Sequence, residues 1–132
     1  MSMKAYQTYR NNAVTTASGG ELTLMLYNGC RKFIQQAIID MKENNYEAKN
    51  KNIQKAQDII QELLITLDPK VEISKQISPL YEFMLVHLRD ANIQNDPKKL
   101  EEVLELVTEF RNTWKQVLLK MKQQKRSQGA EA

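Results

Sequence analysis

Four long segments repeat apolar residues at intervals of three and four positions, and this period restricts the chain to helices. The segments cover about residues 21–43, 47–67, 71–94 and 97–124. The turn and helix-start residues Asn44-Asn45, Asp68-Pro69 and Asn95-Asp96-Pro97 separate them. Only four glycines and three prolines occur in 132 residues, so the sequence offers few other breaks. Four helices of about 20 residues with short connections predict an all-α fold, an antiparallel four-helix bundle.

Each segment has an apolar stripe that we expect to face the core. The third segment is apolar over an arc of about 200°, which is wider than one packing seam requires. Tyr81, Phe83 and Leu85 extend that arc. The expected stripes, in chain order, are Leu22, Leu26, Cys30, Phe33, Ala37 and Met41; Ile53, Ala56, Ile60, Leu63 and Leu67; Ile73, Ile77, Leu80, Met84, Leu88 and Ala91; and Leu100, Val103, Val107, Phe110, Trp114, Val117 and Met121.

The ends of the helices follow from capping residues. Ser18 with Glu21 three residues later has the spacing of a capping box at the first helix. Asp96 is expected to cap the fourth helix, with Pro97 at its first position. Pro79 lacks a backbone N–H, so it should either kink the third helix or mark where its regular part begins.

The chain divides into three parts around the bundle. Residues 1–17 have no helical period, and we expect them to form an extended N-terminal segment packed across the helices. Residues 18–124 form the bundle, and residues 125–132 are expected to be a disordered tail. Tyr6, Tyr9 and Val14 are the groups that could pin the first part to an apolar surface.

Charge and cysteine content exclude several classes of protein. A net charge of +3 is too small to indicate nucleic-acid binding, and the basic cluster near the end is typical of a solvated last turn. No apolar stretch is long enough to insert in a membrane, and residues 1–10 contain no secretory signal. Cys30 is the only cysteine, so no disulfide forms within the chain, which fits the cytoplasm. We expect it to be a small core residue.

The residue inventory predicts neither an enzyme nor a metal or cofactor site. No phosphate-binding loop, nucleophile motif or histidine-cysteine cluster occurs, so no catalytic and no metal-binding residue is assigned. A single-histidine bundle that relays phosphoryl groups through His87 is one alternative. Asp90 lies one turn away and would repel a phosphoryl group, so a structural role for His87 is favoured.

The remaining signal is a surplus of apolar surface. The start of the first helix is apolar on nearly all sides, and the third helix on more than half of its circumference. One explanation is a broad core with an internal seam to the N-terminal segment. The other is a groove for a helix of a partner protein. The pattern alone does not choose between them.

The order and spacing of several short motifs resemble the FliS family, the flagellar secretion chaperones of flagellin. The similarity covers nearly all of residues 6–118, and each motif alone is weak. The matching residues are Tyr9-x-x-Asn12-x-Val14, Thr16-Ala17-Ser18, Glu21-Leu22, Met25-Leu26-Tyr27-x-Gly29, Ala56, Ile59-Ile60-x-Glu62-Leu63, Leu67-Asp68, Leu80-Tyr81-x-Phe83-Met84, Leu88-x-x-Ala91-Asn92, Asp96 and Phe110-Arg111-x-x-Trp114.

Three positions depart from the family pattern. Gly19 stands where the family often has proline, and Asn28 where aspartate is common. The Gly-Glu pair that usually opens the third helix is missing, and Pro79 is present instead. These changes loosen the entry to the first helix and leave the start of the third open, but they remove no catalytic group.

The resemblance implies a cytoplasmic chaperone without catalytic activity or cofactor. Its partners would be the C-terminal segment of flagellin, kept from premature polymerisation, and a component of the flagellar type III export gate. The N-terminal segment of this family covers part of the apolar surface and takes part in docking to the gate. Those roles would fall here to Tyr6, Tyr9, Asn12 and Val14.

For the flagellin-binding groove we choose residues at the margins of the apolar stripes. A self-associating bundle is the third hypothesis, and a weak homodimer of the free protein is compatible with the chaperone hypothesis. The candidate groove residues are Ile59, Leu63, Phe83, Leu85, Leu104 and Leu106.

Overall fold

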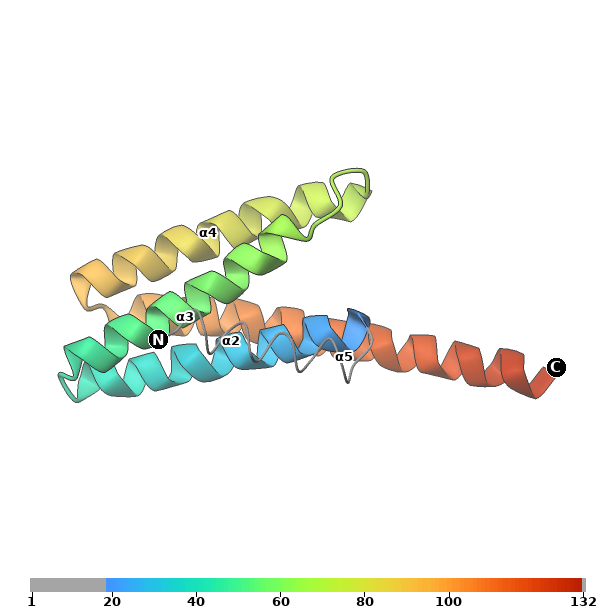
Figure 1. The fold of residues 1–132 in the computed structure, drawn as a ribbon, viewed down its shortest axis with the longest axis horizontal. Helices are drawn as coiled ribbons and strands as arrows, with labels where there is room; N and C mark the ends of the chain where they lie inside the picture. The colour runs from blue at the N-terminus through green and yellow to red at the C-terminus, as the bar shows by residue number, and fades with distance from the viewer. Residues whose placement is uncertain (1–18, 132) are drawn as a thin grey trace.

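The computed structural model describes residues 19–131, with side chains described for residues 19–127. Within that range the chain forms four α-helices and no strand, as the sequence period predicts. The helices are α2 (Gly19–Lys42), α3 (Tyr46–Ile65), α4 (Glu72–Gln94) and α5 (Pro97–Glu131) (Figure 1). The expected N-terminal segment, residues 1–17, and the expected cap Ser18 lie outside the described residues.

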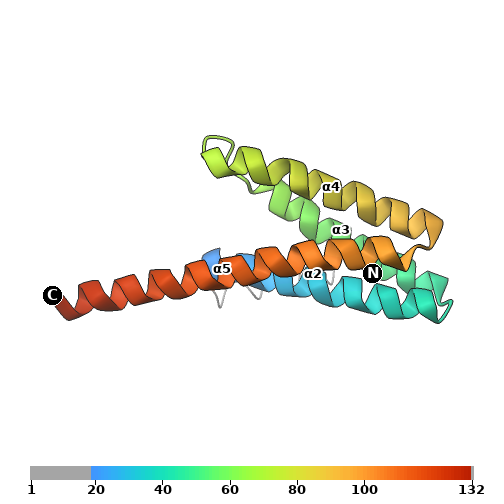
Figure 2. The ribbon, with the colours of Figure 1, turned by 180° about the vertical axis from the view of Figure 1, so that it is seen from behind.

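The four helices form an antiparallel bundle in which each helix packs on two others. α2 contacts α3 and α5, and α4 contacts the same two helices, so α2 and α4 lie diagonally opposite each other. The pair α3–α4 is inclined to the pair α2–α5, and the two pairs lie furthest apart where α4 begins (Figures 1 and 2). The bundle is therefore closed at one end and spread at the other.

The core lies along the inner stripe of each helix. Cys30 and Ile34 of α2, Ile60 of α3, Met84 of α4 and Val103 of α5 are completely buried. This confirms the sequence prediction for Cys30 and for most of the inner stripes. At the spread end, the structure differs from the prediction for α4 and α5. Four residues of their predicted core stripes are exposed there: Ile73, Leu80, Val117 and Met121.

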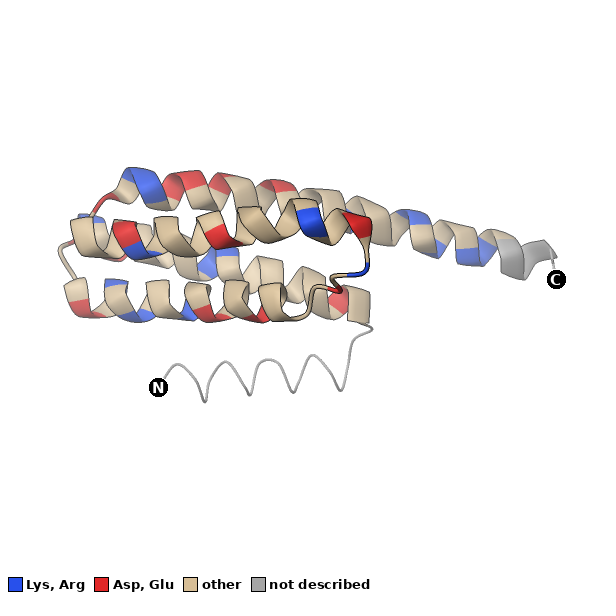
Figure 3. Cartoon of the chain, turned by 90° about the horizontal axis from the view of Figure 1, so that it is seen from above, with Lys and Arg blue, Asp and Glu red and all other residues tan. Residues whose placement is uncertain are grey.

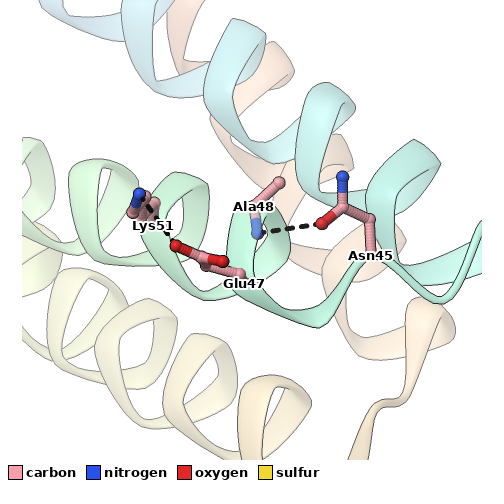
Figure 4. A network of polar contacts seen from close by, with 4 residues as sticks. All are labelled: Asn45, Glu47, Ala48 and Lys51. Carbon is pink, nitrogen blue, oxygen red and sulfur yellow. Dashed lines mark hydrogen bonds and ion pairs between the residues drawn. The ribbon is translucent and has the colours of Figure 1, made fainter.

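The connection between α2 and α3 is held by two asparagines. Asn44 has a φ of 59°, a left-handed conformation that asparagine tolerates better than most residues. Asn45 Oδ1 accepts a hydrogen bond of 3.3 Å from the backbone N–H of Ala48 at the start of α3. Lys51 and Glu47 form an ion pair one turn further along, with 3.3 Å between Nζ and Oε1 (Figure 4).

The connection between α4 and α5 agrees with the predicted helix start. Asn95 is left-handed with a φ of 52°, and Asp96 Oδ1 accepts a hydrogen bond of 3.0 Å from the backbone N–H of Lys98. Pro97 is the first residue of α5. The prediction that Asp96 caps this helix is confirmed.

Two polar side chains are buried between helices with their hydrogen bonds satisfied. Asp40 accepts from Gln36 at 2.9 Å and from Asn52 at 2.7 Å, which links α2 to α3. Lys49 donates to the backbone oxygen of Asn92 at 3.0 Å and to Asn95 Oδ1 at 2.7 Å. Burial lowers the pKa of Lys49. Both groups lie near the closed end, where Asp40 joins α2 to α3 and Lys49 joins α3 to the end of α4.

α4 has the expected bounds and settles the open question of where it begins, whereas α5 is longer than expected. α4 begins at Glu72 and continues through Pro79. The position tolerates proline because both it and Lys75, whose carbonyl loses its helical partner, are exposed to water. α5 continues past Gln124 to Glu131, although residues 125–132 were expected to be disordered. Lys, Gln and Arg favour helix there, and no glycine occurs before Gly129.

Candidate binding groove

An apolar groove of about 500 Å³ lies between α4 and α5 at the spread end of the bundle. α2 contributes its base, and the exposed walls come from the first half of α4 and the middle of α5. We call this surface the α4–α5 groove. Its lining residues are Tyr27, Ile73, Gln76, Ile77, Leu80, Phe110, Thr113, Trp114 and Val117.

The base of the groove is an aromatic cluster from three helices. The hydroxyl oxygens of Tyr27 and Tyr81 lie 2.6 Å apart and form a buried hydrogen bond. Phe110 packs edge-on against Tyr27, with 6.2 Å between the ring centroids, and at a tilt against Tyr81 at 5.8 Å. A tyrosine hydroxyl is protonated at neutral pH, and burial raises the pKa of both tyrosines further. The base is therefore rigid and uncharged.

The walls of the groove expose apolar side chains that none of the other described helices covers. Ile73 is 53% exposed, Leu80 39% and Val117 37%. They belong to the stripes that are buried further along the same helices. Single exposed apolar residues need no explanation, but several that line one groove indicate a binding surface.

One end of the groove is fixed by the only tryptophan of the chain. Trp114 Nε1 donates a hydrogen bond of 2.8 Å to the backbone oxygen of Gly20, which holds α5 against the first turn of α2. The approach is close, because a Cβ atom at Gly20 would lie 2.6 Å from a methyl carbon of Leu118. A glycine at this position lets the two helices meet.

The other end of the groove passes into a polar contact. Phe83 follows Leu80 by one turn and is 47% exposed, and its ring stacks on that of His87 at 4.7 Å. His87 Nε2 lies 2.5 Å from Glu102 Oε2, which connects α4 to α5. The imidazole is thus held between a phenyl ring and a carboxylate.

Two of the residues predicted for the flagellin-binding groove lie in the core. Ile59 is completely buried and Leu63 is 4% exposed, and both pack among the inner stripes of the bundle. Residues in such positions cannot contact a partner while the helices stay packed. We therefore leave both out of the proposed groove.

The other four predicted residues fall on different sides of their helices. Phe83 and Leu85 are two positions apart in α4, as are Leu104 and Leu106 in α5, which places the members of each pair about 160° apart around the helix. Phe83 lies on the side of Leu80, and Leu106 one turn before Phe110, so these two border the groove. Leu85 and Leu104 are half-buried against the core, away from it.

The sequence period places most of the apolar residues that line the groove in the predicted core stripes. Ile73, Leu80 and Val117 continue the predicted core stripes, so the period could not separate them from buried residues. The one useful signal was the wide apolar arc of the third predicted helix. Only the spread of the helix pairs shows which part of the arc is uncovered.

One group of predicted site residues lies outside the described range. Tyr6, Tyr9, Asn12 and Val14, the residues predicted for cap and gate docking, lie outside the described residues. Within residues 19–131 no group of three or more His, Cys, Asp and Glu side chains could hold a metal ion. In the same range none of the helices has the length and hydrophobicity that crossing a bilayer requires.

Comparison with known proteins identifies the family. A sequence profile described as "Flagellar protein FliS" matches residues 2–121. The chain is 49% identical to the flagellar secretion chaperone FliS of Bacillus subtilis over 113 residues, which cover 86% of this chain and 85% of the relative. It is 34% identical to the Escherichia coli protein of the same name over 111 residues, 82% of each chain.

A solved structure shares the fold. The structure described as "Crystal structure of flagellar chaperone from bacteria" superposes on this chain with a TM-score of 0.73 at 16% sequence identity. The match covers 89% of this chain and 98% of that one. At this identity the match supports the four-helix architecture alone. The sequence profile and the two relatives together establish that the chain belongs to the FliS family of flagellar secretion chaperones.

Proposed function

We propose that the protein is a cytoplasmic export chaperone that binds the disordered C-terminal segment of flagellin in the α4–α5 groove. It would prevent premature polymerisation of flagellin and deliver it to a component of the flagellar type III export gate. The role needs no catalytic group and no cofactor. The named relatives are flagellar secretion chaperones, which supports this proposal at the level of the family.

The observation that carries the proposal is the exposed apolar lining of the groove. An amphipathic client segment exposes one apolar face in water and tends to self-associate. Laying that face on Ile73, Leu80 and Val117 removes apolar surface of both partners from water, at about 25 cal/mol per Å². Ordering the client offsets part of that gain, so a reversible complex is expected.

The chemistry of the lining fits a helix in particular. The two walls are helices that run antiparallel, and a third helix laid between them would restore the packing that the spread end lacks. Gln76 and Thr113 are the polar residues of the lining and can bond a polar group of the client. Phe83 and Leu106 extend the apolar surface toward the closed end.

We further propose that the N-terminal segment covers the groove when flagellin is absent. Tyr6, Tyr9, Asn12 and Val14 carry this proposal because of their family resemblance and their place directly before α2. Gly20, in the first turn of α2, lies against Trp114 of the groove, so the described part of the chain begins close to one end of the groove. Deleting residues 1–17 should increase binding of a hydrophobic dye and raise flagellin affinity. Unchanged dye binding and unchanged affinity would contradict the cap.

A phosphorelay role for His87 finds no support in its surroundings. The ring is stacked on Phe83, and one of its nitrogens is hydrogen-bonded to the carboxylate of Glu102. A carboxylate at that distance repels an incoming phosphoryl group. We therefore propose binding without phosphoryl transfer. The His87→Gln variant should accordingly retain flagellin binding.

The deciding experiment compares two exposed positions on α4. Leu80→Asp places a charge in the groove, and Ile93→Asp places the same charge on the same helix at a residue that is 72% exposed. Both variants should keep the melting temperature within a few degrees, because neither side chain is buried. Affinity for a peptide of the flagellin C-terminal segment, measured by calorimetry, should fall at least about tenfold for Leu80→Asp only.

Two further measurements separate the hypotheses. Equal affinities of both variants would show that the client binds elsewhere. Leu85→Asp should unfold the bundle because Leu85 packs on the core. A Leu85→Asp variant that folds but does not bind the peptide would show instead that Leu85 belongs to the groove.

Sedimentation of the protein alone and with the peptide tests self-association. A stable homodimer that the peptide does not dissociate would favour the self-interface hypothesis.

A further inference from the structure

The second half of α5 carries cations without the acids that would balance them. Glu109 is the last acidic residue before Glu131, and Arg111, Lys115, Lys120, Lys122, Lys125 and Arg126 lie between them. Acids occur instead in the first half of α5, where Lys98 and Lys99 accompany them, so the first half carries charges of both signs and the second half is basic (Figure 3). Helix ends favour cations only within the last turn, so the dipole does not account for a run this long.

Four of these cations lie in one row. At 100° per residue, Arg111, Lys115, Lys122 and Arg126 fall within an arc of about 60° and span about 22 Å along α5. We call them the basic row. The row is about 130° around the helix from the α4–α5 groove and faces the side of α2, where Arg111 Nη1 donates to Asn28 Oδ1 at 3.0 Å. It is therefore a surface separate from the groove.

The row is poorly neutralised within the described residues. Lys122 forms an ion pair with Glu21 at 3.6 Å, between side chains that are 60% and 43% exposed. Lys115 and Arg126 are exposed and have no ion-pair partner among residues 19–127. Arg31 of α2 adds another positive charge nearby, and burial together with the charge of Arg111 lowers its pKa. Cations have thus gathered here at some electrostatic cost.

Apolar side chains border the row. Leu119, which is 51% exposed, lies on one side, and Leu118 lies on the other. Residues 1–20 contain Lys4 and Arg10 but no acidic residue, so the chain's own N-terminal segment does not provide complementary charge. A phosphate backbone would leave the leucines uncovered. An acidic helix with leucines of its own would satisfy both kinds of group.

We propose that the basic row of α5 binds an acidic, amphipathic segment of a partner protein, at a site distinct from the α4–α5 groove. The segment would present Glu or Asp at helical spacing to Lys115, Lys122 and Arg126, and apolar residues to Leu119. Because most of these charges are exposed, the complex should form quickly and weaken steeply with salt.

The test uses the full chain and a labelled synthetic helix of about 20 residues, long enough to follow the row. The helix has Glu at every third or fourth position and Leu beside it. A second helix replaces each Glu by Gln, and a single-stranded DNA of equal charge is the third probe. Fluorescence anisotropy should show binding of the acidic helix alone, with an affinity that falls at least about tenfold on raising salt from low to physiological concentration.

Two double variants with the same change in net charge complete the design. Lys115→Glu with Arg126→Glu inverts the row, while Lys98→Glu with Lys120→Glu changes exposed cations outside the row on the same helix. The first should lose acidic-helix binding at least about tenfold and the second should keep it within about twofold. Both should retain flagellin-peptide binding. The acidic-helix test therefore gives a clear result even if the proposed chaperone function is wrong.

Several outcomes would overturn the proposal. Equal losses in the two double variants would show unspecific charge attraction. Tighter binding of DNA with the same dependence on Lys115 and Arg126 would assign the row to nucleic acid. A dimer of the free protein that only the row variant abolishes would assign it to the acids in the first half of α5 in a second copy. No binding of the acidic helix at low salt would also reject the proposal.

Discussion

Trp114 Nε1 donates a hydrogen bond of 2.8 Å to the backbone oxygen of Gly20, between residues that are 94 positions apart in the chain. The bond joins the middle of the last helix to the first turn of the first described helix. The same indole ring lines the α4–α5 groove. The first turn of α2 and the α4–α5 groove are therefore linked through one side chain.

This position makes Trp114 a reporter of the groove. It is the only tryptophan, so its emission can be followed without other contributions if tyrosine is not excited. Binding of the flagellin peptide should remove water from the half-buried indole and shift its emission to shorter wavelength. The Ile93→Asp protein should show the same shift. A peptide that binds by calorimetry without moving the emission would contradict binding at this end of the groove.

Replacing one tyrosine at the base of the groove should lower the unfolding free energy more than replacing both. Tyr81→Phe leaves the buried hydroxyl of Tyr27 without its partner, which should cost about 1–3 kcal/mol of unfolding free energy. Adding Tyr27→Phe removes the unsatisfied group, so the double variant should recover part of that loss. Urea unfolding of the three proteins measures this. A double variant less stable than the single one would refute the interpretation.

The protein should lose stability at alkaline pH because three buried groups resist deprotonation. Burial raises the pKa of Cys30 from 9.0 to about 12, and burial also raises those of Tyr27 and Tyr81 above 10.0. The folded chain holds these protons more tightly than the unfolded chain. Their stabilisation is therefore complete below about pH 9 and is lost as the pH rises toward 12.

The Cys30→Ala variant separates the contribution of the thiol to this pH dependence from that of the tyrosines. The thiol accounts for on the order of 4 kcal/mol across that range, so the variant should lose less stability than the parent between about pH 9 and 10. Unfolding free energies measured with denaturant at a series of pH values test this. Parallel curves for the two proteins would show that Cys30 does not carry the effect. The alanine also leaves a small cavity, which lowers both ends of the curve equally.

The two neighbouring glycines at the start of α2 should respond differently to alanine. Among the described residues nothing lies within 4 Å of a Cβ at Gly19, so Gly19→Ala should stabilise the helix by up to about 1 kcal/mol. At Gly20 the new Cβ meets a methyl of Leu118 at 2.6 Å, and that side chain must turn away. Gly20→Ala should therefore gain little or nothing. Thermal unfolding compares the pair, and equal gains would disprove the close contact.

Much of the architecture could be predicted from local sequence. Asn45 and Asp96 cap helices where turn chemistry indicated, and Cys30 and Met84 are buried where the period placed them. These outcomes depend on neighbours within a few positions, or on a stripe that any partner helix would cover. Pro79 was harder, because its effect depends on whether the freed carbonyl of Lys75 meets water or protein.

The groove could be predicted only in part. Phe83 and Leu106 border it, whereas Ile59 and Leu63 are core residues and Leu85 and Leu104 lie on other faces. The apolar period marks which side of a helix faces inward. It does not show over what length of the helix another helix packs against that side.

The sequence by itself determined the helices, the Asp96 cap, most of the inner stripes and the family, because these follow from residue types at fixed spacing. Only the tertiary structure decided that the two helix pairs spread apart at one end and leave Ile73, Leu80 and Val117 uncovered by the other described helices. The physical reason is that coverage of an apolar stripe depends on the inclination and length of other helices, which are properties of the packing and not of the stripe itself.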